Sequence, residues 1–213
     1  MGNGAVFREQ HNIAADTKIF CLLAGSRKGE VKRHIPIYAR AIGLLARTYP
    51  NLAIFLAAPP HVMPIIAPFL NDCPFPVIIA SDEEDKKNGI AASDFAFVKS
   101  GTVAFEVAMA KVPMLIMYKV NKISAWLMRR MIKTKFVNLI NILLGKEVIP
   151  ELIQERARPL MLASCANTML AIADAKKNQQ ENIEAALKML TPKSGAKPSD
   201  EAAKVVLQIL GVR

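Results

Sequence analysis

Two short segments of the chain combine small residues, hydroxyls and charge in a way that suits a phosphorylated ligand. The first, GSRKGE at 25–30, lies between an apolar run and a helical pattern. Gly25 permits a tight turn, Ser26 can cap the following helix, and the first amides of a helix can hold an anion. Arg27 can add a planar fork of donors that fits a diphosphate. The competing interpretation is an ordinary helix cap without a ligand.

The second segment, KSGT at 99–102, is followed by Glu106. Ser100 and Thr102 can cap a helix or bind an anion. Glu106 stands four residues after Thr102, so the two side chains project from the same face of a helix. A carboxylate placed there can accept hydrogen bonds from both hydroxyls of a ribose. The alternative is a capped helix that carries a solvated glutamate.

A third segment is rich in positive charge. Between Glu106 and Glu147 the sequence contains no Asp or Glu but eight Lys and Arg residues. Trp126 lies in this span with Arg129, Arg130 and Lys133, a composition typical of an amphipathic helix at a membrane interface. Nucleic acid, anionic lipid or a diphosphate could each exploit the charge, as could a merely solvated basic face. An ordinary docked helix explains the apolar spacing equally well.

Asn141 stands in an apolar setting, NLINILLG at 138–145. A buried amide needs specific hydrogen-bond partners. Asn141 is therefore either a ligand contact or a side chain that stabilises a turn.

Elements that could position these segments follow from the apolar pattern. Short apolar runs typical of strands occur at 18–24, 52–57, 77–80, 94–98 and 113–118, with helical or Pro-rich segments between them at 28–48, 60–70, 82–91 and 102–111. Such alternation predicts an α/β fold with a parallel sheet covered by helices on both faces. Ligands of these sheets bind at the carboxyl ends of the strands, where the segments at 25–30 and 99–102 should lie.

The rest of the chain is expected to be helical. Helices are predicted at 122–134, 158–175, 181–190 and 200–210, with a Pro- and Gly-containing linker at 191–199. We interpret residues 1–17 as interdomain linker, 18–175 as a nucleotide-binding domain and 176–213 as a helical tail.

Composition limits the class of protein. The net charge is +10 and 52% of the 213 residues are hydrophobic, which excludes a disordered chain and favours an anionic partner. The longest charge-free stretch, 48–71, is broken by five prolines and is not expected to span a membrane. No signal peptide is recognised at the N-terminus, so we expect a cytoplasmic protein. The Cys and His residues lack ligand spacing, and no metal site is expected.

In their order and spacing, these segments resemble the lipid-A-disaccharide synthase family. The matching motifs are L-x-G-S-R-x-x-E at 23–30, A-S-D at 92–94, S-G-T-x-x-x-E at 100–106, P-M at 113–114, Y-K-V at 118–120, W-L-x-x-R-x-I-K-T at 126–134, N-x-L-x-G at 141–145 and P-E-L-I-Q-E at 150–155. The chain departs from the family pattern at Ala24 and Ile140, where Pro is usual, and at Lys99, where a small residue is usual.

The resemblance implies the Rossmann-like C-terminal half of a GT-B glycosyltransferase. That half would bind UDP-2,3-diacylglucosamine, and the whole enzyme would transfer its sugar, with inversion, to 2,3-diacylglucosamine 1-phosphate and release UDP. The resemblance assigns Ser26, Arg27 and Asn141 to the diphosphate and sugar, with Arg27 and Asn141 as the catalytic pair. It assigns Ser100, Gly101 and Thr102 to the phosphates and Glu106 to the ribose. No cofactor or metal is implied.

The resemblance also sets expectations about partners. The general base and the acceptor site belong to the family's N-terminal half, so the chain alone is expected to be inactive. The alternative is a non-catalytic relic that acts only as a nucleotide-binding or interaction domain. An anionic inner-membrane surface in a Gram-negative bacterium is expected to contact Trp126, Arg129, Arg130 and Lys133. A homodimer is compatible with the family, whereas nucleic acid is not an expected partner.

Overall fold

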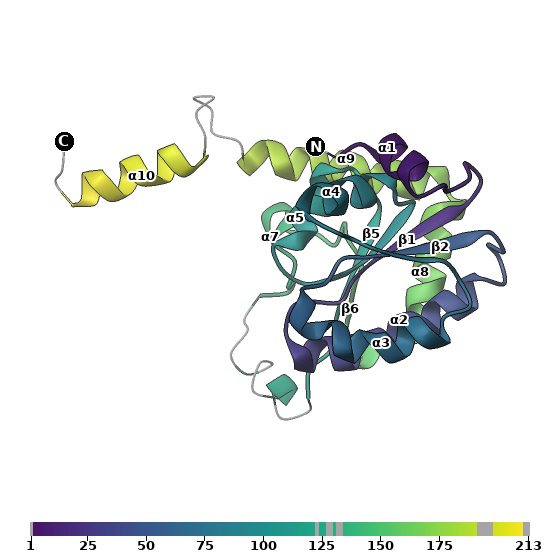
Figure 1. Ribbon diagram of the computed structural model, residues 1–213. Helices are drawn as coiled ribbons and strands as arrows, with labels where there is room; N and C mark the ends of the chain where they lie inside the picture. The colour runs from purple at the N-terminus through teal and green to yellow at the C-terminus, as the bar shows by residue number, and fades with distance from the viewer. Residues whose placement is uncertain (1, 122–123, 127–129, 131–133, 191–197, 211–213) are drawn as a thin grey trace.

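β1 (Lys18–Leu23) lies in the interior of a six-stranded parallel sheet (Figure 1). The computed structural model describes residues 2–121, 124–126, 130, 134–190 and 198–210. The strand order is β3-β2-β1-β4-β5-β6. The other strands are β2 (Leu52–Leu56), β3 (Val77–Ile79), β4 (Phe95–Lys99), β5 (Met114–Tyr118) and β6 (Glu151–Ile153). All neighbouring pairs are parallel, which confirms the expected sheet.

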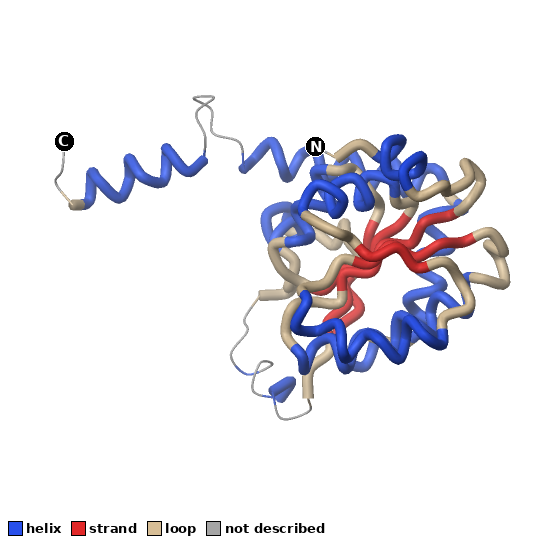
Figure 2. Tube along the Cα trace, viewed as in Figure 1, coloured by secondary structure: helices blue, strands red, loops and turns tan. Residues whose placement is uncertain are grey.

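Helices cover both faces of this sheet (Figure 2). On one face lie α2 (Lys28–Leu45), α3 (Met63–Asp72) and α8 (Pro159–Ala171). On the other lie α1 (Gly4–Gln10), α4 (Glu83–Ala92), α5 (Val103–Met109), α7 (Leu139–Leu144) and α9 (Ala173–Leu190). Two 3-10 turns, η1 (Pro60–Val62) and η2 (Gln154–Arg156), and the helix α10 (Pro198–Ile209) complete the described elements.

The central strand shows why both faces are covered. Along β1, Phe20 and Leu22 belong to the core under α2 and α8, while Ile19 and Cys21 belong to the core under α1 and α5. All four side chains are fully buried. Successive strand residues point to opposite faces, so an uninterrupted apolar strand requires two cores.

Three elements differ from the sequence expectation. Residues 4–10, expected as linker, form α1, which Asn3 caps and which buries Phe7 against Phe55 at a ring separation of 5.1 Å. β6 and α7 were not expected because each is short and the first residue of β6 is Glu151. The expected linker at 191–199 lies mostly outside the described residues, and α10 begins at Pro198.

Two buried polar side chains tie helices to strand ends. Gln179 of α9 accepts a hydrogen bond from the Met114 amide at 2.8 Å and donates to the Met114 carbonyl at 3.0 Å. The His34 ring of α2 accepts from the Lys119 amide at 3.1 Å through Nε2, so Nδ1 donates to the Ala24 carbonyl at 2.7 Å. Burial lowers the pKa of His34, although the backbone bonds oppose this. His34 thus joins the ends of β1 and β5 in its neutral form.

The strand order places a crevice between β1 and β4. The chain leaves β1 towards β2 on one side and leaves β4 towards β5 on the other. The loops diverge at this switch point, which is where open α/β sheets bind ligands. As expected, the segments at 25–28 and 100–102 follow the carboxyl ends of β1 and β4.

Candidate functional site

A cavity of about 600 Å³ opens at the carboxyl ends of β1 to β4. Its volume is within the range of small-molecule sites. Its walls come from the loops that follow the four strands, and the lining residues are Leu23, Gly25, Ser26, 57–60, 80–83, Lys86, Lys99, 101–103 and Glu106. Within the described residues, no three His, Cys, Asp or Glu side chains converge on a common point. The polar chemistry of the cavity therefore rests on lysines, hydroxyls, backbone groups and carboxylates.

The loop after β1 is held in an unusual backbone conformation. Gly25 has a φ of +106°, which residues with a side chain rarely adopt. A Cβ at this position would also stand 2.6 Å from the Glu30 Oε2 atom. Ser26 was expected to cap α2, but the N-cap residue is Arg27 and no side chain caps the helix. The Ser26 carbonyl accepts a hydrogen bond from His61 Nε2 at 2.7 Å, which joins this loop to the connection after β2.

Glu30 is a buried carboxylate beneath the same loop. Its Oε1 atom lies 3.2 Å from Arg27 Nη1 and 3.4 Å from Lys99 Nζ. Its Oε2 atom has no hydrogen-bond partner among the described residues. The Arg27 side chain is 77% exposed, whereas that of Lys99 is 18% exposed and lines the cavity. Glu30 therefore gathers two cations where the loops after β1 and β4 meet.

The loop after β4 contributes backbone and one hydroxyl to the cavity. Gly101 and Thr102 line it, and Thr102 is the N-cap residue of α5 without a side-chain capping bond. The Ser100 hydroxyl instead donates to the Val137 carbonyl at 3.2 Å. Ser100 thus fastens its loop to the segment that precedes α7.

Glu106 lines the cavity from α5 and is paired with a lysine. Its Oε2 atom lies 2.8 Å from Lys86 Nζ, which comes from α4. Burial alone would lower the pKa of Lys86, but the hydrogen bond and charge of Glu106, helped by Glu83, raise it above its ordinary value. The Glu106 side chain is 34% exposed, so the carboxylate is accessible while its orientation is fixed by Lys86.

Asn141 lies inside the core and uses all its hydrogen-bonding groups. Nδ2 donates to the Ile149 carbonyl at 2.7 Å and to Glu151 Oε1 at 2.9 Å. Oδ1 accepts from the amides of Val148 at 2.9 Å and Ile149 at 3.0 Å. Glu151 in turn accepts from the Val137 and Asn138 amides. Of the two interpretations of Asn141, this geometry supports a side chain that stabilises a turn.

The basic span is described only in part. Trp126 is 59% exposed, and the Arg130 guanidinium lies 4.9 Å from the centre of its ring. Arg129 and Lys133 lie outside the described residues. Among the described residues, no helix is long and apolar enough to cross a bilayer.

Comparison with known proteins identifies the family to which the chain belongs. The family model described as lipid-A-disaccharide synthetase matches residues 3–206. The chain belongs to the lipid-A-disaccharide synthase family. The synthase of Gluconobacter oxydans is 34% identical over 209 residues, which are 98% of this chain and 50% of that protein. The synthase of Rickettsia prowazekii is 37% identical over 203 residues, 94% of this chain and 53% of that protein. The chain thus spans about half the length of these lipid-A-disaccharide synthases.

Solved structures support the same architecture for this member of the lipid-A-disaccharide synthase family. The glycosyltransferase WaaG, involved in lipopolysaccharide biosynthesis, superposes with a TM-score of 0.57 at 18% identity over 93% of this chain and 50% of WaaG. The C-terminal CMP-Kdo binding domain of WaaA from Acinetobacter baumannii gives 0.54 at 11% identity over 86% of this chain and 95% of that domain. The fold is therefore that of a GT-B C-terminal domain.

Most of the site residues that the sequence predicts lie close together in the structure of this member of the lipid-A-disaccharide synthase family. Ser26, Gly101, Thr102 and Glu106 line one cavity, and Arg27 follows Ser26 beside it. Ser100 fastens the loop after β4 to Val137, whereas the partners of Asn141, Val148, Ile149 and Glu151, do not line the cavity. Sequence reasoning missed two lining lysines. Lys99 had a signal, because it ends a strand directly before S-G-T. Lys86 had none, because its place opposite Glu106 depends on how α4 packs beside α5.

Proposed function

We propose that this chain is the donor-binding part of a lipid-A-disaccharide synthase and that its cavity binds the UDP of UDP-2,3-diacylglucosamine. The cavity at the β1–β4 switch point carries this proposal, because hydroxyls, backbone groups, two lysines and an oriented carboxylate converge there. In the whole enzyme, the sugar passes with inversion to 2,3-diacylglucosamine 1-phosphate, and UDP is released.

The residues take different roles in this proposal. Ser26, Gly101 and Thr102 bind the diphosphate, and Ser100 holds the loop that carries them. Arg27 and Lys99 stabilise the negative charge that develops on UDP as the bond between the sugar and the diphosphate breaks. Glu106 accepts the ribose hydroxyls.

Two physical features support these assignments. Lys99 and Arg27 are already gathered on Glu30, so little ordering is needed when a diphosphate arrives. Lys86 fixes the direction of the Glu106 carboxylate before a ribose binds. The acceptor hydroxyl needs a general base. We assign that base, together with the acceptor site, to the part of the family's sequence that this chain does not match.

Titration calorimetry with UDP tests the nucleotide site. Lys99→Met should weaken binding by about 2 kcal/mol, roughly thirtyfold, because it removes a charge-assisted contact. Lys87→Met is the matched control, since Lys87 is exposed, lies beside Lys86 and does not line the cavity. Equal affinities of wild type and Lys99→Met would refute the site.

A radiolabelled acceptor assay tests the catalytic proposal. The 213-residue chain should form disaccharide only when the N-terminal part of a family member is supplied, because transfer requires donor and acceptor at near-attack distance. Turnover by the chain alone would place the acceptor site here. UDP binding without complementation by any cognate partner would favour a non-catalytic binding domain.

A weak membrane contact is part of the proposal. Trp126 and Arg130 form an exposed aromatic and cationic pair, which suits an anionic lipid surface. Sedimentation with anionic vesicles should show binding that declines with salt, since the Debye length is about 8 Å at physiological ionic strength. Salt-independent binding, or none at low salt, would contradict it.

A further inference from the structure

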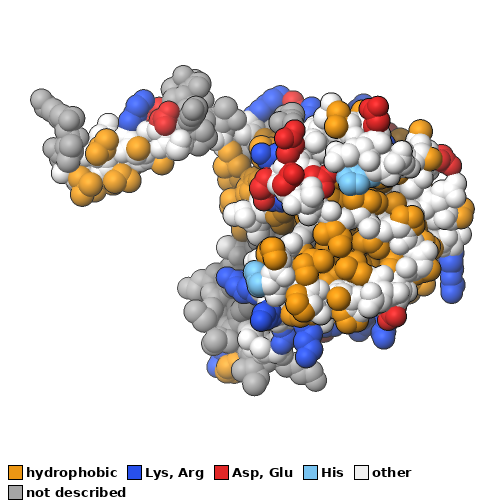
Figure 3. Space-filling model, viewed as in Figure 1, with side chains coloured by type: hydrophobic (Ala, Val, Ile, Leu, Met, Phe, Trp, Pro, Cys, Tyr) orange, Lys and Arg blue, Asp and Glu red, His pale blue; other side chains and the backbone are white. Residues whose placement is uncertain are grey.

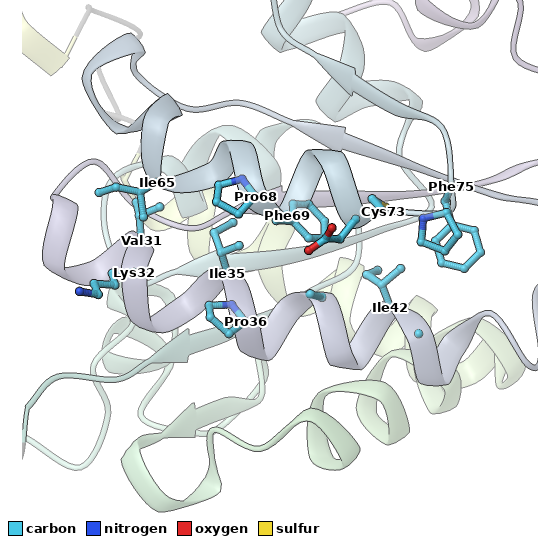
Figure 4. A pocket seen from close by; sticks show the side chains of 14 residues that line it. Val31, Lys32, Ile35, Pro36, Ile42, Ile65, Pro68, Phe69, Cys73 and Phe75 are labelled. Carbon is cyan, nitrogen blue, oxygen red and sulfur yellow. The ribbon is translucent and has the colours of Figure 1, made fainter.

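An apolar groove of about 920 Å³ runs between α2 and α3. Val31, Ile35 and Ile42 from α2 and Ile65, Pro68 and Phe69 from α3 line it, and Figure 4 shows the two rows of side chains facing each other. Hydrophobic atoms gather over this region of the surface, with Lys and Arg along one edge (Figure 3). An apolar hollow of this size on a folded domain is a feature typical of a ligand or partner site.

The groove begins next to the nucleotide cavity. The loop with Ser26 leads directly into α2, and the turn with His61 leads directly into α3. These two connections line the cavity and are joined by the 2.7 Å His61–Ser26 hydrogen bond. Val31 lies four residues after Arg27, about 6 Å along the helix axis. The groove and the cavity are therefore separated only by this hydrogen-bonded pair of connections, and a ligand in the cavity can extend across it into the groove.

Positive charge lies at the end of the groove nearest the cavity, and the rest of the groove is mainly apolar, as the binding of an amphiphilic anion requires. Lys32 lines the groove near the cavity, and Lys28 and Arg33 are exposed on the same turns of α2. Beyond them the walls are apolar as far as Gly43, about 18 Å from Val31 along the helix, and Asp72 lies towards the far end. An anionic head with a long apolar tail matches this order.

We propose that the α2–α3 groove binds an acyl chain of the acylated sugar nucleotide whose UDP occupies the neighbouring cavity. This inference rests on the proposed function. Each methylene transferred from water into the groove raises the affinity about fourfold. The groove thus makes the domain selective for long acyl chains.

Gly43 offers a way to shorten the groove without disturbing the fold. It lies within α2 and lines the groove, and apart from the adjoining residues of the chain and the nearby backbone of α2, no atom stands within 4 Å of the place where its Cβ would be. Gly43→Leu fills the far end, whereas Gly43→Ala gives a similar gain in helix propensity with little added volume. The first variant is the test and the second its matched control.

The experiment compares two donor probes, UDP-2,3-diacylglucosamine with butanoyl or with tetradecanoyl chains, titrated below the micelle concentration. The wild type and Gly43→Ala should bind the tetradecanoyl probe at least a hundredfold more tightly. Gly43→Leu should lose at least tenfold of this preference. All three proteins should bind free UDP equally.

Alkylation of Cys73 gives an independent measurement. Cys73 is half-buried in the groove wall, so the tetradecanoyl probe should slow its reaction with N-ethylmaleimide at least fivefold, and free UDP should not. Equal affinities for both probes, an unchanged preference in Gly43→Leu, or unprotected Cys73 would overturn the groove assignment while leaving UDP binding intact. Failure of the wild type to bind UDP would instead refute the proposed function, and the groove inference with it. A dimer that Gly43→Leu dissociates would make the groove a protein interface and overturn the inference.

Discussion

Asn141→Leu decides whether the asparagine is a structural or a ligand residue. Leucine has a similar volume but no polar atoms, so the Val148 amide and both backbone groups of Ile149 lose their partner. Each buried backbone group left unpaired lowers the free energy of unfolding by about 1–3 kcal/mol. Because the surroundings relax in part, we expect a total loss of roughly 3–6 kcal/mol for the three groups. A domain of this size has about 5–15 kcal/mol of stability in total. For a domain of this size, the loss should lower Tm by roughly 6–24 °C.

Calorimetry and urea unfolding measure this loss. Asn178→Leu is the control, because Asn178 is exposed on α9 and such substitutions usually change stability by less than about 0.5 kcal/mol. The folded fraction of Asn141→Leu should bind UDP nearly as well as the wild type. An unchanged Tm with a large loss of UDP affinity would refute the structural interpretation and restore the catalytic one.

Asn141→Asp keeps the reasoning testable if the leucine variant does not fold. The aspartate retains an acceptor for the amides of Val148 and Ile149 but places a second carboxylate beside Glu151 Oε1, where the amide nitrogen now lies at 2.9 Å. Like charges disfavour each other's ionised form. The destabilisation should therefore be largest near neutral pH and shrink as the pH falls towards about 4. A penalty that does not vary with pH would contradict this network.

Three further predictions concern the walls of the cavity and the thiols. Gly25→Ala should lower the free energy of unfolding in urea by roughly 1–3 kcal/mol and weaken UDP binding, because the backbone is left-handed there and the new Cβ meets Glu30. Wild-type stability and affinity would show that the loop relaxes freely. Burial lowers the pKa of His34, so the unfolded chain takes up the proton first and stability should be lost as the pH falls below about 6.5. His34→Gln, which cannot titrate, should remove that part of the pH dependence of Tm, and an unaltered profile would contradict it. Burial raises the pKa of the Cys165 thiol to about 11, so at neutral pH iodoacetamide should modify Cys73 well before Cys165, as peptide mass spectrometry can show; the reverse order would contradict this.

The elements that the sequence predicts correctly are those whose signal is local. Uninterrupted apolar runs such as 19–23 and 52–56 are buried on both faces, so their composition alone marks them as parallel strands. Gly25 and the S-G-T at 100–102 follow such runs directly, which places them at the strand ends. Five of the proposed site residues could be found in this way because each is close in sequence to a strand: Ser26, Arg27, Ser100, Gly101 and Thr102.

The remaining features depend on contacts between distant segments. Lys86 reaches Glu106 only because α4 packs beside α5, and no spacing in the sequence records that. α1 has one turn of buried surface, carried by Phe7, which is too little periodicity to identify a helix. Asn141 could not be assigned from its apolar neighbours because those neighbours are equally consistent with a ligand contact. Its partners at 148–151 are brought together only by the turn after α7.

The pairing of Gln179 with Met114 gives the domain a built-in reporter of local opening. The first amide of β5 is protected by a side chain from α9, whereas the Ile116 amide two residues later is bonded to the Pro150 carbonyl at 2.8 Å. If α9 detaches while the sheet stays intact, solvent deuterium will enter at Met114 and not at Ile116. The ratio of the two exchange rates therefore separates undocking of the last core helix from unfolding of the sheet, within one spectrum and without a mutation.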